Sequence, residues 1–385
     1  MMIRSLVTGT FAAATAAAVL AAGSHTPIAS PGTEPIAVDH YVRVRSTVPS
    51  ITGQVTPIFV RERALTSTVL RAAPLGDRVV LFVHGAGTPA EVAFDVPYQD
   101  YSWMAYLANA GFDVFAMDMT GYGRSARPFV MNDPCNLSSA QQALFVPSLI
   151  AAPCQASYGQ QATTLASDWN DINGVVDYIR SLRRVEKVSL VGWSLGGPRA
   201  GGYAAQNPDK IHKLVLLAPA YSADASATPP RSVPSAGAAF NTQSRQEFDA
   251  NWDRQVSCAG QVDPGARDSV WSNMLASDPI GSTWGGGVRR APNVTTWGWN
   301  AAMAAKVKSP TLLVAGALDV QVSPAGVSRL HTDLGAPQKL FVDLGCSSHN
   351  ALWERNHVAL FHASREWLER SSVNGTATGT LKLGY

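Results

Sequence analysis

Residues 188–197 read Val188-Ser189-Leu190-Val191-Gly192-Trp193-Ser194-Leu195-Gly196-Gly197. The largely apolar run at the start is typical of a buried strand, and a segment of helical length follows Gly196. Between them, the Gly-x-Ser-x-Gly pattern predicts a sharp strand-to-helix turn that lifts the Ser194 hydroxyl above a sheet. Gly192 and Gly196 lack a Cβ, so strand and helix can approach closely there. Ser194 is therefore the candidate nucleophile; the alternative is a glycine-rich turn with an incidental serine.

Other apolar runs of strand length recur along the chain and alternate with segments of helical length. The strand-like runs are 79–83, 112–116, 188–191, 214–217, 311–314 and 339–342, and 41–45 and 56–61 are candidates for earlier, antiparallel strands. The helical segments include 102–110, 162–182, 196–206 and 357–370. This alternation predicts an α/β fold, in which helices flank a mostly parallel central sheet.

A serine hydroxyl becomes a useful nucleophile only when a base removes its proton. His349 lies in the short loop that follows the last predicted strand and leads into a helix. His357 and His362 fall inside that helix, so we expect them to be structural or exposed. His349 is therefore the candidate base.

Asp319 is the candidate acid, because it follows the strand at 311–314 and a glycine turn. Its position completes the chain order serine, acid, histidine. A carboxylate there can accept the imidazole N–H and stabilise the imidazolium. Two alternatives stay open: Asp319 caps the helix that begins near Pro324, or Asp224 supplies the acid instead.

The residues His84-Gly85-Ala86-Gly87 follow the predicted strand at 79–83 directly. Acyl transfer needs N–H donors for the oxyanion of its tetrahedral intermediate. The backbone N–H groups of Ala86 and Leu195 are the candidate oxyanion hole, the latter because it follows the nucleophile. We expect His84 to orient its loop and to take no part in proton transfer.

With these pieces, the chain resembles the α/β-hydrolase superfamily over roughly residues 79–368. The motifs that carry the resemblance are His84–Gly87, Asp118-Met119-Thr120-Gly121-Tyr122-Gly123-Arg124-Ser125, Gly192–Gly196, Asp319 and His349. The resemblance implies a serine esterase or lipase-like member with a cap, and a structural role for Asp118. Haloalkane dehalogenases and epoxide hydrolases of this superfamily attack with aspartate, so a serine at this turn points away from them.

The predicted organisation is a signal peptide at 1–23, a linker at 24–37 and a hydrolase core at 38–220 and 306–370. A cysteine-containing insertion at 127–161 and a cap at 221–305 interrupt this core, and a tail at 371–385 ends the chain. The charged, then alanine-rich, then small-residue order at the start indicates a cleaved export signal, with a membrane anchor as the alternative. We therefore expect secretion to an extracellular or periplasmic compartment.

The four cysteines, Cys135, Cys154, Cys258 and Cys346, fit an oxidising compartment and show no zinc-site spacing. Pairing of Cys135 with Cys154 would leave Cys258 with Cys346, but three connectivities are open.

The predicted cap holds five tryptophans, which suggests a substrate with an apolar or aromatic part; a small core that buries its own tryptophans is the alternative. Arg199, Arg289 and Arg290 are the candidates for binding a substrate carboxylate, but we expect them to be solvated.

Composition narrows the function further. The 385 residues carry a net charge of +2 and only 15% charged residues, which argues against nucleic-acid binding and against disorder. No motif for a metal or organic cofactor is present, so we expect neither. The sequence thus predicts a secreted carboxylic ester hydrolase that acts on a small-molecule ester. The alternatives are an aminopeptidase of the proline-iminopeptidase type, a lactonase or C–C bond hydrolase, and a non-catalytic binding protein.

Overall fold

The computed structural model describes residues 34–69, 75–226, 238–285, 287–291 and 298–384. The export signal predicted at 1–23 lies outside these ranges. None of the helices in the described part of the chain is long and apolar enough to cross a membrane.

Within the described residues, nine strands form one sheet in the order β1-β2-β4-β3-β5-β6-β9-β10-β11. Their bounds are β1 (Ile36–Arg45), β2 (Val55–Ala64), β3 (Val79–Val83), β4 (Asp113–Met117), β5 (Val188–Trp193), β6 (Ile211–Leu217), β9 (Thr311–Gly316), β10 (Lys339–Leu344) and β11 (Gly379–Leu383). β2 runs antiparallel to β1 and β4, and every other neighbouring pair is parallel. The predicted α/β fold is confirmed.

Alternate residues of β3 show why this sheet is covered on both faces. Val79, Leu81 and Val83 pack in one buried cluster, and Val80 and Phe82 pack in another. A strand buried on both faces needs a continuous apolar run, which is the pattern that predicted it.

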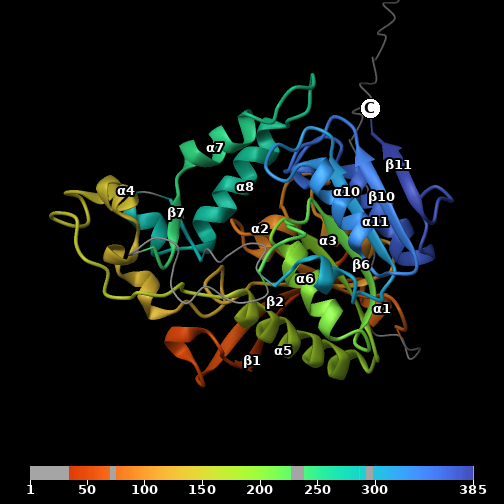
Figure 1. Cartoon of the computed structure of the whole chain (residues 1–385), viewed down its shortest axis with the longest axis horizontal. Helices are drawn as coiled ribbons and strands as arrows, with labels where there is room; N and C mark the ends of the chain where they lie inside the picture. Colours follow the sequence, from red (N-terminus) through yellow and green to blue (C-terminus); the bar gives the residue numbers. More distant parts are fainter. Residues whose placement is uncertain (1–33, 70–74, 227–237, 286, 292–297, 385) are drawn as a thin grey trace, which may run out of the picture.

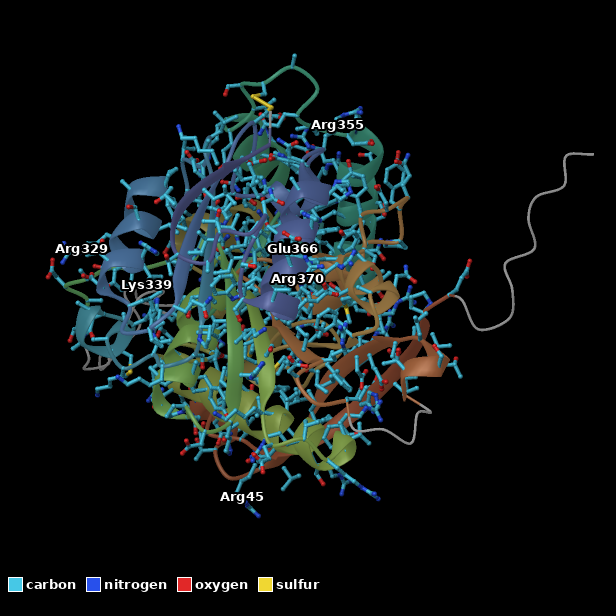
Figure 2. The ribbon with its side chains drawn as sticks, turned by 90° about the vertical axis from the view of Figure 1, so that its right-hand side faces the viewer. Arg45, Arg329, Lys339, Arg355, Glu366 and Arg370 are labelled. Atoms are coloured by element: carbon cyan, nitrogen blue, oxygen red, sulfur yellow. A yellow bond between two sulfur atoms is a disulfide. The ribbon has the colours of Figure 1, made fainter. Side chains whose placement is uncertain are left out.

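Helices on the two faces of the sheet contribute the other side chains of these two clusters. The first includes α5 (Leu165–Arg183), α6 (Gly196–Gln206), α9 (Ala301–Ala304) and α10 (Pro324–Asp333). The second includes α2 (Ala90–Phe94), α3 (Trp103–Asn109) and α11 (His357–Arg370), with α7 (Arg245–Asp253) and α8 (Pro264–Ser277) packed against it. A further helix, α1 (Thr66–Val69), follows β2. In Figure 2, the charged side chain of Arg45 lies at the lower edge of the molecule, and those of Glu366 and Arg370 lie over α11 near the middle of the view.

The two insertions lie together beside the core, on the left of Figure 1. The first contains α4 (Ser139–Gln142) among short 3-10 turns, and the second contains β7 (Asn241–Gln243) paired with β8 (Val288–Arg290), as well as α7 and α8. The Gln141 side chain donates to the Thr242 carbonyl and accepts from the Thr242 N–H. This pair of bonds joins the two insertions.

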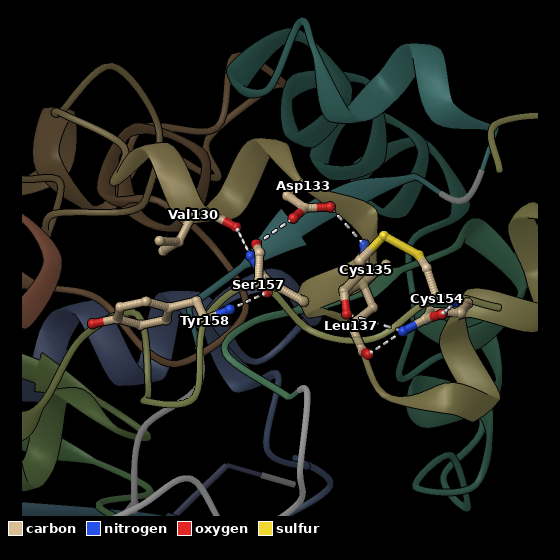
Figure 3. The surroundings of a disulfide bond; sticks show 9 residues. Val130, Asp133, Cys135, Leu137, Cys154, Ser157 and Tyr158 are labelled. Carbon is tan, nitrogen blue, oxygen red and sulfur yellow. Dashed lines mark hydrogen bonds between the residues drawn. A yellow bond between two sulfur atoms is a disulfide. The ribbon is translucent and has the colours of Figure 1, made fainter.

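The cysteines pair as Cys135–Cys154 and Cys258–Cys346. The first disulfide lies within the first insertion, where Asp133 accepts hydrogen bonds from the Cys135 N–H and from the Ser157 hydroxyl (Figure 3). The second connects the second insertion to the loop after β10. One disulfide therefore closes a local loop, and the other ties the second insertion to the core.

Two predicted boundaries need correction. β1 begins at Ile36, inside the predicted linker at 24–37, and β11 lies inside the predicted tail at 371–385. β11 pairs in parallel with β10 as an edge strand and is largely exposed. Its short run has no buried apolar pattern, so only the pairing with β10 identifies it as a strand.

Candidate active site

Ser194 sits at a strained turn between β5 and α6. Its φ of 58° is left-handed, which is uncommon for a residue with a side chain. A Cβ at Gly192 would lie 2.4 Å from the Gly196 carbonyl oxygen, and one at Gly196 would lie 2.3 Å from that of Val83. Only glycine fits at these two positions, so the turn depends on both of them.

His349 and Asp319 come from loops after two neighbouring strands, β10 and β9. Asp319 Oδ2 lies 2.9 Å from His349 Nδ1, and both side chains are buried. The other oxygen, Oδ1, accepts from the N–H groups of Gln321 and Val322, each over 2.8 Å. The carboxylate is thus oriented by its own loop and directed at the imidazole.

The two alternatives for the acid are not supported. Ser323, whose hydroxyl accepts from the Gly326 N–H, caps α10, so Asp319 does not cap it. Asp224 is exposed and makes no hydrogen bond to His349. The structure therefore brings Asp319, and not Asp224, to the histidine.

Ser194 and His349 line one pocket at the carboxyl ends of the parallel strands. His349 Nε2 is buried and has no hydrogen-bond partner among the described residues. Ser194 as a residue is 7% exposed, and its hydroxyl does not bond to His349 Nε2 in this arrangement. Hydrogen bonds between a nucleophile and its base are often long until a substrate is bound.

A buried carboxylate, Glu354, holds the loop that carries His349. It accepts from the N–H and the hydroxyl of Ser348 over 2.7 and 2.5 Å. From the second insertion, Trp252 Nε1 and Gln261 Nε2 donate to it, each over 3.0 Å. Burial raises the pKa of this carboxyl above its usual value. Sequence reasoning missed Glu354, because its partners lie up to 102 residues away and leave no local pattern.

The candidate oxyanion loop packs directly against the nucleophile, since a Cβ at Gly85 would lie 3.0 Å from that of Ser194. His84 Nε2 accepts from the Met119 N–H over 3.0 Å, so its Nδ1 carries the proton and bonds to the Gly85 carbonyl. Burial lowers the pKa of His84 well below its usual range. His84 is therefore neutral and hydrogen-bonded at both ring nitrogens, which orients the loop that carries it.

Ala86 and Leu195 flank Ser194 from two sides. Ala86 lines the pocket, and its carbonyl accepts a hydrogen bond from the Tyr122 hydroxyl over 2.5 Å. Leu195 precedes the first residue of α6, where backbone N–H groups have no partner within the helix. Their N–H groups remain the candidates for an oxyanion hole.

The expectation that the candidate arginines are solvated was wrong for Arg199 and Arg289, whereas Arg290 is half-buried. Arg199 is fully buried, where Nε donates to Asp168 over 2.7 Å and Nη1 donates to the His84 and Gly85 carbonyls over 2.9 Å. Arg289 is buried in an ion pair with Asp278. A buried arginine needs such partners, because desolvation of its charge is costly.

The stretch from Asp118 to Ser125 supports the same region. Asp118 accepts from the Ala90 N–H over 2.8 Å and from the Arg124 N–H over 2.9 Å, and burial raises its pKa to about 6. Gly123 must be glycine, since a Cβ there would lie 1.9 Å from the Asp118 carboxylate. The carboxylate joins two loops near the pocket and does not line it.

Two connected pockets lead to Ser194, and residues of the second insertion line both. The inner pocket is narrow, with about 60 Å³ of free volume, whereas the outer one has about 470 Å³. They share Gln243, Asn251, Arg290 and Gln321. The site is therefore approached through a polar vestibule.

The insertion's tryptophans face the interior. Trp252 and Trp299 are fully buried, Trp271 is 8% exposed, and neither these nor Trp284 line the pockets. Trp297 lies outside the described residues. The aromatic side chains of the inner pocket are instead Trp193, Phe248 and Trp353. The described tryptophans of the insertion therefore pack in a buried core, whereas other residues of the insertion line the pockets over the site.

The described residues contain no group of three or more His, Cys, Asp or Glu side chains that could hold a metal ion.

The comparisons with known proteins agree with this architecture. The family model for the alpha/beta hydrolase fold matches residues 78–356. A solved serine hydrolase involved in carbazole degradation is similar with a TM-score of 0.53 and 17% identity, over 87% of this chain and 99% of that chain. A thermophilic esterase from Thermogutta terrifontis has a TM-score of 0.50 and 15% identity, over 86% of this chain and 98% of that chain. At these identities the structural likeness concerns the fold. The comparison with curated protein sequences finds no match.

Proposed function

The chain belongs to the alpha/beta hydrolase fold family, and on this premise we propose that it is a serine hydrolase that cleaves carboxylic esters through Ser194, His349 and Asp319. The observation that carries the proposal is the 2.9 Å bond from His349 Nδ1 to Asp319, with Nε2 left without a partner among the described residues and with Ser194 and His349 lining one pocket. A histidine held in this way can take a proton at Nε2 while the carboxylate stabilises the resulting charge.

In the first half of the proposed reaction, His349 Nε2 takes the Ser194 hydroxyl proton as Oγ attacks the ester carbonyl. The N–H groups of Ala86 and Leu195 stabilise the oxyanion, each contributing about 2.7–4 kcal/mol. The C–O bond to the alcohol then breaks, and His349 gives its proton to the leaving oxygen. An acyl group remains on Ser194.

In the second half, His349 removes a proton from water, whose oxygen attacks the acyl carbonyl. The same two N–H groups stabilise the second oxyanion. When the bond to Oγ breaks, the proton returns from His349 to Ser194 and the carboxylic acid leaves. Each residue ends the cycle as it began.

The lining of the site favours esters over peptides with a free amino terminus. An aminopeptidase needs carboxylates to bind the substrate ammonium group. No Asp or Glu side chain lines the inner pocket, and in the outer pocket Glu247 already accepts hydrogen bonds from Ser244. An ester needs no such group.

The test compares the wild type with Ser194→Ala on short p-nitrophenyl esters, together with labelling by a fluorophosphonate. We expect the rate of Ser194→Ala to fall by at least about 10³-fold and its labelling to vanish. Ser328→Ala, an exposed serine on α10, is the matched control and should behave as wild type. Equal rates for wild type and Ser194→Ala would refute the proposal.

We also propose export of the chain. The support is the pair of disulfides, which persist in oxidising compartments. Amino-terminal sequencing of protein recovered from the medium or periplasm of an expressing cell should begin at or near residue 24. Recovery only in the cytosol with residues 1–23 intact would contradict export.

A further inference from the structure

Arg290 brings a positive charge to the pocket without a balancing carboxylate. All Asp and Glu residues of the sequence lie within the described ranges. Among these residues, no carboxylate oxygen lies within 4.0 Å of the Arg290 side chain, although Arg289 beside it is paired with Asp278. Two adjacent arginines therefore differ: one is neutralised inside the insertion, and the other faces the site.

The position of Arg290 is close to the proposed chemistry. Its Nε lies 3.4 Å from the Ala86 carbonyl oxygen, and a Cβ at Gly87 would lie 3.3 Å from its Nη2. It lines both pockets. The guanidinium thus borders the candidate oxyanion loop at the junction of the inner and outer pockets.

Glu247 attracts the Arg290 charge through space, but no carboxylate among the described residues pairs with it directly. The shared lining is otherwise formed by the amides Gln243, Asn251 and Gln321. A second arginine in the outer pocket, Arg254, bonds to the amide oxygen of Asn251 and has no carboxylate within 4.0 Å among the described residues. Glu247 is the one acidic residue lining the described pocket, and its carboxylate serves the capping box of α7.

The Arg290 side chain is half-buried, and burial lowers the pKa of its guanidinium. A bound anion would replace the favourable interactions with water that the guanidinium loses on burial. Carboxylates fit best, because the planar guanidinium can donate two parallel hydrogen bonds to them.

We propose that the preferred substrates are esters that carry a free carboxylate, such as half-esters of short dicarboxylic acids, and that Arg290 binds this carboxylate. The inference rests on the proposed function, since it assigns a substrate class to the same site. It revises the apolar or aromatic substrate expected from the tryptophan content, because the described tryptophans of the insertion do not line the pockets.

The test compares monomethyl glutarate with methyl 5-amino-5-oxopentanoate, in which a neutral amide replaces the carboxylate at nearly equal size. We expect wild-type kcat/KM to be about 10- to 100-fold higher for the half-ester, as for a hydrogen bond between charged groups. Arg290→Gln should bring the ratio close to one, and Arg290→Lys should retain part of it. Arg329→Gln, an exposed arginine on α10 (Figure 2), is the matched control and should keep the wild-type ratio.

A binding measurement keeps the test independent of turnover. Calorimetry with Ser194→Ala should detect glutarate, and the Ser194→Ala/Arg290→Gln double variant should not bind it. Circular dichroism shows whether Arg290→Gln folds. If it does not, the ratio of kcat/KM for the two esters is measured with Arg290→Lys instead. A wild type that hydrolyses both esters equally, or a ratio that survives in a folded Arg290→Gln, overturns this inference alone. No hydrolysis and no fluorophosphonate labelling in the wild type would instead refute the proposed function.

Discussion

The indole Nε1 of Trp193 donates a hydrogen bond over 2.9 Å to the backbone carbonyl of His349. Trp193 precedes Ser194 in the chain, so one bond connects the turn of the candidate nucleophile with the loop of the candidate base. The two rings lie 5.7 Å apart, and Trp353 packs edge-on against Trp193. The distance between Ser194 and His349 therefore depends on a side chain that we do not assign to the chemistry.

Replacing Trp193 by Phe tests this dependence. The variant loses the bond to His349, and we expect kcat for an ester to fall by about tenfold and the stability to fall by about 1–2 kcal/mol. Trp103→Phe is the matched control: it removes a similar buried indole bond, to Ser364, between α3 and α11. It should cost similar stability and leave kcat unchanged. Equal kcat for the two variants would show that the Trp193 bond does not position His349.

Asp319→Asn tests the choice of acid. An amide can donate to the imidazole and favour the wrong tautomer, so we expect kcat to fall by roughly 10³- to 10⁴-fold. Asp224→Asn changes an exposed carboxylate and should leave the rate as in the wild type. Steady-state kinetics on one ester measure both variants. A strong loss in Asp224→Asn with little loss in Asp319→Asn would reverse the assignment.

The two disulfides should differ in their effect on activity. Cys135 and Cys154 are 19 residues apart within the first insertion, so replacing both by Ser should cost about 3 kcal/mol of stability with little loss of activity in the folded protein. Cys346 lies three residues before His349 and is joined to Cys258 in the second insertion. Replacing that pair by Ser should lower both stability and kcat/KM. Urea unfolding and assays at a temperature where each variant is folded separate the two effects.

Buried carboxyl groups predict how stability depends on pH. Burial raises the pKa of Asp171 to about 7, against 3.8 in the unfolded chain. Between these values the folded protein binds more protons than the unfolded one, so stability falls as pH rises from about 4 to 7. We expect a higher Tm near pH 5 than at pH 8.

Asp171→Asn removes this proton-binding site and keeps the shape of the side chain. The Tm difference between pH 5 and pH 8 should shrink, by an amount on the order of a few degrees. It should not vanish, because Asp113, whose pKa is raised to about 7, and Asp118, at about 6, act in the same direction. Thermal melts at the two pH values measure the change, and an unaltered difference would contradict the prediction.

Local patterns were enough to predict the fold and the turn at Ser194. Apolar runs of five or six residues marked the buried strands, because a parallel strand covered on both faces needs apolar side chains at every position. Gly192 and Gly196 marked the turn, because their effect is steric and acts within a few residues. These features depend on neighbours in the chain, so they can be recognised without coordinates.

Partners far apart in the chain were decided by the tertiary structure alone. Asp319 rather than Asp224 reaches His349, Arg199 is buried against a loop 114 residues away, and Glu354 binds the second insertion. The same holds for β11, whose exposed residues become a strand only by pairing with β10. The strength of a hydrogen bond or ion pair depends on the distance between its two partners in the folded structure. That distance cannot be derived from the number of residues that separate them in the sequence.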